Sequence, residues 1–139
     1  MNQDLYDAYK HTTYLARTPL GEVKIRPEAT EPLLDALLAD HNVEEWAFIT
    51  AWNPGSQLES VHENHERQRE LERAIEAAGF VFFRGSGVPD SDHWQPEESV
   101  LVLGISQARG VEFGRRFGQE AILCGRAGEA ARLVWCMPV

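Results

Sequence analysis

The chain has 139 residues, of which 43% are hydrophobic and 25% are charged, and its formal net charge is −9. This length predicts a single domain, residues 1–139, built around one hydrophobic core. The composition argues against a disordered chain, a collagen-like repeat and a disulfide scaffold.

The acidic excess lies mainly in residues 1–66, which carry twelve acidic residues against four basic ones. No basic stripe follows, which predicts no nucleic-acid binding, and an acidic surface is repelled by anionic lipid. The longest apolar stretches are about seven residues, against roughly 20 needed to cross a bilayer. The N-terminus lacks the basic and apolar regions of a signal peptide, so we expect a cytoplasmic protein without a membrane partner.

The first third of the chain predicts a short N-terminal helix followed by a hairpin and a second helix. Leu5, Tyr6 and Tyr9 indicate the short helix. Strands are expected at 12–16 and 22–26, around a turn at 19–21. The second helix is expected to begin with Thr30 as its N-cap.

The rest of the chain alternates between apolar strands and helices. A doubly buried strand is expected at 45–52, and the punctuation at 53–56 ends it. A long helix then runs to about 78, with Ser56 and Ser60 as candidate caps. The pattern continues with a strand at 80–83, a loop through Gly85 and Gly87, and a strand at 99–105. It ends with a helix capped by Ser106 and strands at 121–124 and 132–137. We therefore predict an α/β (α+β) fold: a mixed sheet of about six or seven strands with βαβ crossovers and three main helices.

Cys124 and Cys136 are the two cysteines. A hairpin centred on Gly128 would place Cys124 opposite Arg132 and Cys136 opposite Glu120, too far apart for a disulfide. Without a CxxC spacing they also make a weak zinc signal, so we expect two buried, reduced thiols and no metal site.

The long helix carries the most informative irregularity. Its inward stripe includes Asn64 and Gln68 where apolar residues are expected. A buried amide without a partner costs on the order of 1–3 kcal/mol, so these side chains must be hydrogen-bonded or face a cavity. Asn53 and Ser56 lie at the nearby strand end, and Arg67 could add a cation. Together they predict a polar pocket for a small anion.

The alternative interpretation is that Asn64 and Gln68 tie down the 53–56 loop and bind nothing. Trp52 and Trp94 could wall a cleft, although large aromatic residues are more often part of the core. Both alternatives stay open at the level of the sequence.

Several motifs resemble catalytic or metal-binding patterns but lack a required member. His62 and Glu66 could hold a cation with Asp90, Asp92 or His93, but the spacing matches no helical zinc motif. The segment around Ser106 resembles a nucleophile elbow, whose catalytic histidine normally comes later in the chain. No histidine follows His93, so an N-cap is the better interpretation of Ser106. Glu97 and Glu98 are adjacent on a strand and point to opposite faces, which argues against an acid/base pair. No cofactor is predicted, and catalysis is left open.

Five segments together resemble a bacterial family, domain of unknown function 3293. They are Thr12-Thr13-Tyr14, Phe48-Ile49-Thr50-Ala51-Trp52-Asn53-Pro54 with Ser56, Asn64-x-x-Arg67 with Leu71, Trp94-x-x-Glu97-Glu98-Ser99, and Phe117-Gly118-Gln119-x-Ala121-Ile122. The resemblance implies a complete domain but brings no activity, cofactor or catalytic residue. Its pattern draws attention to Asn53, Ser56, Asn64, Arg67 and Gln119.

The sequence therefore supports two hypotheses. The first is a small protein that binds a small anionic or nucleotide-like ligand at the strand–helix junction 53–68. Its ligand-binding residues would be Trp52, Asn53, Ser56, Asn64, Arg67, Gln68 and Gln119. The second is a non-catalytic acidic protein that docks on a basic protein partner, with an association that weakens in salt.

Overall fold

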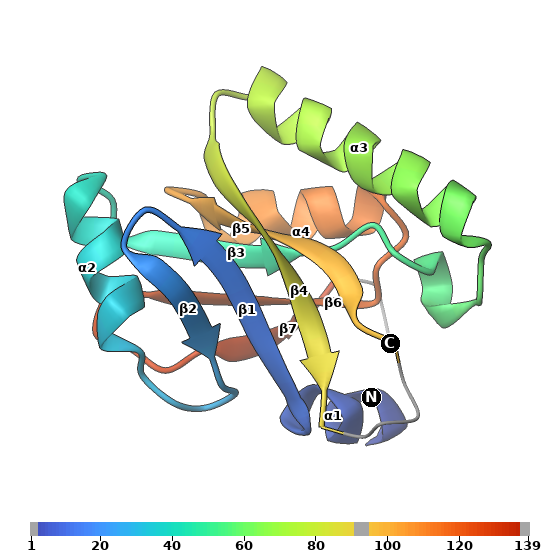
Figure 1. Cartoon of the computed structure of the whole chain (residues 1–139), viewed down its shortest axis with the longest axis horizontal. Coiled ribbons are helices and arrows are strands. Elements are labelled where there is room, and N and C mark those ends of the chain that lie inside the picture. The colour runs from blue at the N-terminus through green and yellow to red at the C-terminus, as the bar shows by residue number, and fades with distance from the viewer. Residues whose placement is uncertain (1–2, 91–94, 137–139) are drawn as a thin grey trace.

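The computed structural model describes residues 3–90 and 95–136 of the chain, except for the side chain of Ser56. In this part of the chain seven strands form one sheet, in the order β2-β1-β4-β5-β3-β6-β7 (Figure 1). The strands are β1 (Thr12–Thr18), β2 (Gly21–Ile25), β3 (Glu45–Ile49), β4 (Val81–Pro89), β5 (Glu97–Leu103), β6 (Ala121–Arg126) and β7 (Arg132–Trp135). The helices are α1 (Gln3–Lys10), α2 (Pro32–Asp40), α3 (Val61–Ala77) and α4 (Gln107–Arg116), with a 3-10 turn η1 (Pro54–Ser56).

The mixture of helices and strands is as predicted, but the mixed sheet with βαβ crossovers is wrong, and so is the number of three helices. Every neighbouring pair of described strands is antiparallel. Helix α3 connects β3 to β4 and helix α4 connects β5 to β6, and in each case another strand lies between the two that are connected. Continuous apolar runs show that helices cover the strands. They do not show which strands pair, because a strand buried on both faces has the same pattern in either direction.

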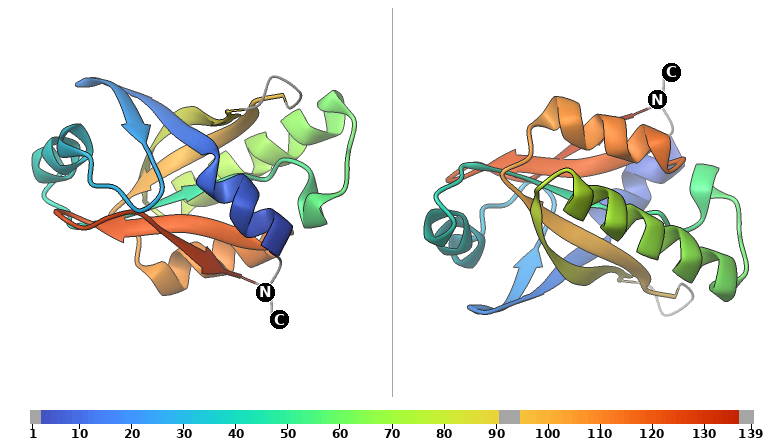
Figure 2. Two further views of the ribbon diagram at one scale, coloured as in Figure 1. Left: turned by 90° about the horizontal axis from the view of Figure 1, so that it is seen from below. Right: turned by 90° about the horizontal axis from the view of Figure 1, so that it is seen from above.

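Helices α3 and α4 lie side by side on one face of the sheet (Figure 2). On α3, Leu71 and Ile75 are fully buried, and on α4 Phe113 is nearly so. They pack against the residues of β3, β5 and β6 that point to this face, which include Ala47 and Val102. Burying a leucine or isoleucine side chain contributes about 1.5–3 kcal/mol, so this face fixes both helices on the sheet.

The sheet is curled, so that its opposite face packs against α1, α2 and its own β1–β2 hairpin (Figure 1). Trp46 and Phe48 of β3 point to this face, while Ala47 and Ile49 point to α3 and α4. This alternation explains why the 45–52 segment reads as apolar on both sides.

Strand β4 is longer than predicted. It continues through Gly85 and Gly87 to Pro89, where a loop was expected, and pairs with both β1 and β5 over this stretch. A Cβ on Gly85 would overlap the carbonyl oxygen of Leu15 in the neighbouring strand β1. Glycine therefore marks a close approach within the sheet here, and the expected loop is part of a paired strand.

The ends of the helices follow local side-chain chemistry. Ser60 caps α3 by accepting from the Glu63 amide (3.1 Å), and Ser106 caps α4 by accepting from the Arg109 amide (3.2 Å). The predicted cap of α2 is off by one residue, because the Glu31 carboxylate, not Thr30, accepts from the Leu33 amide (2.9 Å). Capping bonds of this kind contribute about 1 kcal/mol each.

The C-terminal hairpin has the predicted register, with Cys124 opposite Arg132 and the Cys136 amide bonded to the Glu120 carbonyl. Both cysteines are buried and reduced, as predicted. Burial raises the pKa of the Cys136 thiol to about 11, so this thiol is protonated and unreactive at neutral pH. Among the described helices, none combines the length and the apolar character that crossing a bilayer requires.

Candidate functional site

The loop that follows β3 turns sharply at Asn53. This residue has φ 45° and ψ 64°, a left-handed conformation in which asparagine is favoured over most other residues. Its Oδ1 accepts hydrogen bonds from the Glu59 amide (3.0 Å) and from Nδ2 of Asn64 (2.8 Å). The side chain of Asn53 therefore holds both ends of the segment that leads into α3.

Asn64 completes the pair from the helix side. Its Oδ1 accepts from the Asn53 amide at 2.8 Å, so the two asparagines are joined by reciprocal hydrogen bonds. Asn64 is only 2% exposed. Its oxygen and nitrogen are both used within the protein, which matches the alternative interpretation, in which this residue ties down the loop.

Gln68 lies one turn further along α3, and only one of the two polar atoms of its side chain has a hydrogen-bond partner among the described residues. Its Oε1 accepts from the Ala51 amide at 3.0 Å, and the residue is fully buried. Its Nε2 has no hydrogen-bond partner among the described residues. An orphaned buried donor costs free energy, so Gln68 is a weaker tie than Asn64.

Gln119 fixes the same loop from the other side. Its Nε2 donates to the Trp52 carbonyl at 3.1 Å, and the Gly55 amide donates to the Gly118 carbonyl nearby. Gly118 has φ 74°, and a Cβ there would lie 2.7 Å from Pro54, so only glycine fits this contact. We call Asn53, Asn64, Gln68 and Gln119 the polar junction.

Two further predicted site residues lie beside the polar junction. The ring of Trp52 is half-buried and contacts His65 edge-on, with 5.2 Å between the ring centroids. Ser56 ends the η1 turn, and its side chain lies outside the described residues, as does all of Trp94.

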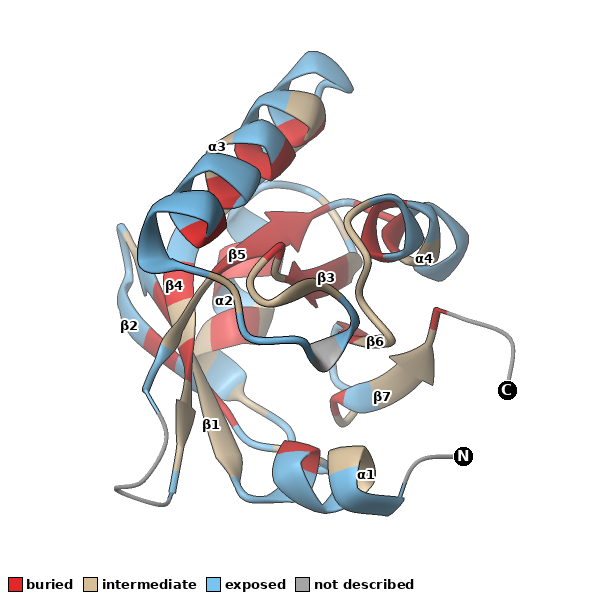
Figure 3. Cartoon of the chain, turned by 90° about the vertical axis from the view of Figure 1, so that its right-hand side faces the viewer, coloured by how far each residue is buried: buried red, intermediate tan, exposed pale blue. Residues whose placement is uncertain are grey.

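A second feature lies between α3 and α4, which Figure 3 shows above β5 and β3, and it reaches Pro54 of the η1 turn. A groove of about 700 Å³ opens here. We call it the arginine groove, because four arginines line it together with a single carboxylate. Its lining residues are Pro54, Arg67, Glu70, Arg73, Ala74, Arg115, Arg116, Phe117 and Gly118.

Most of the positive charge of the groove has no close acidic partner. Arg67 has one carboxylate at 3.8 Å, from Glu59, and both side chains are partly exposed, so the pair is weak. Arg73 and Arg116 form no ion pair with any described residue, and Arg116 lies over the ring of Phe117 at 5.4 Å.

Arg115 is oriented differently from the other three arginines. Its Nε donates to the Cys136 carbonyl at 2.8 Å, which orients the guanidinium group without neutralising its charge. This bond fixes the direction of the side chain.

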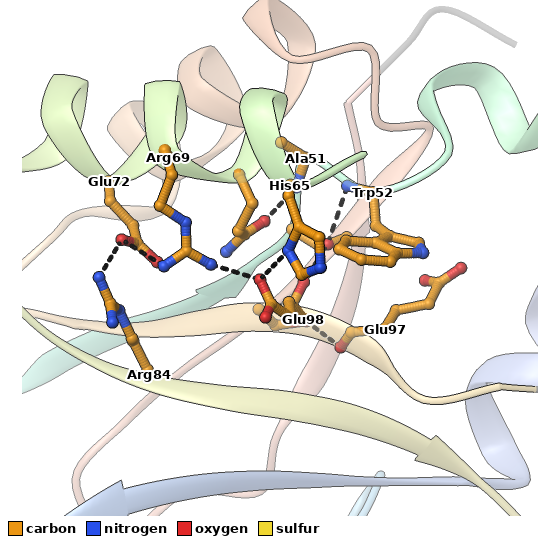
Figure 4. Close-up of polar contacts among 11 residues, drawn as sticks. Ala51, Trp52, His65, Arg69, Glu72, Arg84, Glu97 and Glu98 are labelled. Atoms are coloured by element: carbon orange, nitrogen blue, oxygen red, sulfur yellow. Dashed lines mark hydrogen bonds and ion pairs between the residues drawn. The ribbon is translucent and has the colours of Figure 1, made fainter. Parts of the chain in front are cut away.

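Ionic contacts also connect α3 to the sheet, as Figure 4 shows. Glu98 of β5 accepts from Arg69 and lies 3.4 Å from Nδ1 of His65. Further along α3, the buried carboxylate of Glu72 is paired with Arg69 (3.3 Å) and with Arg84 of β4 (2.9 Å). These arginines are engaged by carboxylates, in contrast to those of the groove.

Glu97 and Glu98 have different surroundings, as strand alternation predicts (Figure 4). Glu97 accepts a long hydrogen bond from Nδ2 of Asn53 (3.5 Å). Burial raises the pKa of the Glu97 carboxyl, and the Asn53 bond only partly opposes this. Glu97 therefore contacts the polar junction through Asn53, whereas Glu98 pairs with Arg69 and His65.

No group of three or more metal-ligating side chains occurs within residues 3–90 and 95–136. His62 lies 3.1 Å from Glu66, and Asp90 pairs with Arg26. Asp92 and His93 lie outside the described residues.

Among the predicted site residues whose side chains the structure describes, Arg67 alone lines the groove. Asn53, Asn64 and Gln119 bond to the protein itself, and they hold the Pro54 wall of the groove in place. Sequence reasoning missed Arg73, Arg115 and Arg116. The spacing of Arg67 and Arg73, with Ala74 beside them, is a signal on one side of α3, but nothing in the sequence shows that the end of α4 lies opposite.

Comparison with known families gives one match. A family model described as "Protein of unknown function (DUF3293)" matches residues 49–122. The chain belongs to this family. The DUF3293 segment contains the whole polar junction and every residue that lines the arginine groove. No curated protein and no solved structure matches the chain.

Proposed function

We propose that this DUF3293 protein binds a small phosphate-bearing molecule in the arginine groove. One observation carries the proposal: four arginines line a single groove in a chain whose net charge is −9. Like charges brought together on two helices repel each other, so the arrangement costs stability unless an anion compensates it.

The chemistry of the groove suits phosphate. A guanidinium group presents a planar fork of donors that matches phosphate oxygens, and its hydrogen bonds to an anion are stronger than neutral ones. The volume of about 700 Å³ lies within the usual range for small-molecule sites. Phe117 adds an apolar surface to an otherwise polar lining.

The sequence predicts a small anionic or nucleotide-like ligand at the junction 53–68; the proposal keeps an anionic ligand, specifies a phosphate group and moves the site to the groove. Arg67 belongs to both descriptions, whereas the carboxamides of the polar junction position the wall of the groove and do not touch the ligand. Trp52 and Ser56 stay predictions for ligand contact.

Inorganic phosphate tests the proposal. Phosphate should raise the melting temperature of the wild-type protein more than chloride at equal ionic strength. At 100 times its Kd, phosphate would add about 2.7 kcal/mol to the free energy of unfolding. Arg116→Gln should lose this gain. Arg17→Gln, an equal charge change at an exposed position on β1, should keep it. Equal responses of the two variants would contradict the proposal.

The docking hypothesis predicts the opposite pattern. The protein would show no specific response to phosphate, and a basic protein would bind with an affinity that falls steeply as salt rises.

A further inference from the structure

The groove arginines are spread over two helices and along one of them. Arg67 and Arg73 are six residues apart on α3, which separates their backbone positions by about 9 Å along the helix axis. Arg115 and Arg116 come from the last turn of α4. A single phosphate occupies only part of this span, whereas a longer anion can follow it.

The carboxylate of Glu70 interrupts the row of positive charges that α3 contributes to the groove. It lies between Arg67 and Arg73 in the sequence and lines the same groove. A single phosphate placed centrally would meet this carboxylate, which repels it. Two linked anionic groups can instead place one charge on either side of Glu70.

The net charge of the groove lining also favours an anion with more than one phosphoryl group. Four guanidinium groups and one carboxylate leave an excess of three positive charges in the lining. A single phosphate ester carries about −1.5 to −2 at pH 7 and does not compensate this excess. A diphosphate carries more negative charge and does so more completely.

From these three observations we infer that the arginine groove is built for a diphosphate group, such as that of a nucleoside diphosphate. This inference rests on the proposed function and narrows the class of ligand. Arg115, oriented by the Cys136 carbonyl, offers its terminal nitrogens to one phosphoryl group, and the remaining arginines share the second.

Isothermal titration with pyrophosphate, orthophosphate and succinate tests the inference at equal ionic strength. Pyrophosphate should bind at least about tenfold more tightly than either of the other two, because it places charge on both sides of Glu70 and offers more acceptor oxygens. Equal affinity for pyrophosphate and orthophosphate would overturn the diphosphate inference and leave phosphate binding intact. Succinate binding as tightly as pyrophosphate would also overturn it. If none of the three binds, the proposed function itself fails.

The variant Glu70→Gln sharpens the test, because it removes the dividing charge without changing the size of the side chain. We expect it to raise the affinity for orthophosphate more than that for pyrophosphate, so that the tenfold preference shrinks. Glu70 is exposed on α3, so the variant is expected to fold. An unchanged or larger preference in Glu70→Gln would contradict the role of this carboxylate.

Discussion

The polar junction and the arginine groove both include residues of α3, yet they use their polar groups in opposite ways. In the junction, Asn53 and Asn64 bond to each other and to the backbone at 2.8–3.0 Å, inside the protein. In the groove, Arg73 and Arg116 face solvent without an acidic partner among the described residues. The comparison teaches that a buried polar side chain on a helix does not by itself indicate a ligand site, because its hydrogen-bond partners can lie within the protein.

The largest effect that separates the two regions is expected at Asn64. Asn64→Leu removes two short hydrogen bonds and leaves the Asn53 amide without its acceptor, so we expect a loss of about 2–3 kcal/mol in the free energy of unfolding. Urea denaturation measures it. Glu76→Ala, exposed on the same helix, should change stability by less than about 0.5 kcal/mol. A similar small change for Asn64→Leu would show that the junction is not structural.

Gln68 should give a smaller effect than Asn64, although it is more deeply buried. Gln68→Met loses the bond to the Ala51 amide but also removes the orphaned Nε2, so the two costs offset and the net change should stay within about 1 kcal/mol. The same denaturation experiment measures it. A loss as large as that of Asn64→Leu would indicate that Nε2 has a bound partner in solution, such as a buried water.

Glu97 is expected to make the free energy of unfolding depend on pH. Burial raises the pKa of Glu97 above 4.5, so the folded state binds the proton more tightly than the unfolded state does. The stability that the proton contributes is complete below the unfolded pKa and is lost as the pH rises through the folded pKa. Glu97→Gln should therefore match the wild type at pH 4 and exceed it at pH 7.5, by less than the loss in Asn64→Leu.

Thermal unfolding at the two pH values checks the prediction for Glu97. As a control, Glu98→Gln removes the carboxylate that faces Arg69 and His65 and should bring no gain at pH 7.5. A Glu97→Gln variant that is less stable than the wild type at pH 7.5 would show that the ionised carboxylate has a partner in solution.

The smallest effect on stability is expected in the groove. Arg73→Gln and Arg116→Gln should change the free energy of unfolding by less than about 0.5 kcal/mol without ligand, and any change should be a gain at low salt, where repulsion between the arginines is strongest. Their effect should appear only when phosphate is present. A large loss without ligand would mean that these arginines are structural.

The sequence predicts the elements better than their arrangement. The capping serines Ser60 and Ser106 and the hairpin at Gly128 are local features, and the structure confirms them. The pairing of β3 with β5 and β6 depends on contacts between distant segments, and apolar periodicity does not encode it. The same limit applies to the site. The inward position of Asn64 follows from helical spacing, whereas the groove exists only because α4 ends beside α3.

Side-chain NMR observes both regions in one titration and tests the central claim most directly. With inorganic phosphate added to the ¹⁵N-labelled protein, the Nε–H signals of Arg67, Arg73 and Arg116 should shift and reach saturation. The side-chain amide signals of Asn53, Asn64 and Gln119 should stay in place, because these NH2 groups donate within the protein. Saturable shifts of the junction amides, or no saturable shift of the groove arginines, would contradict the account.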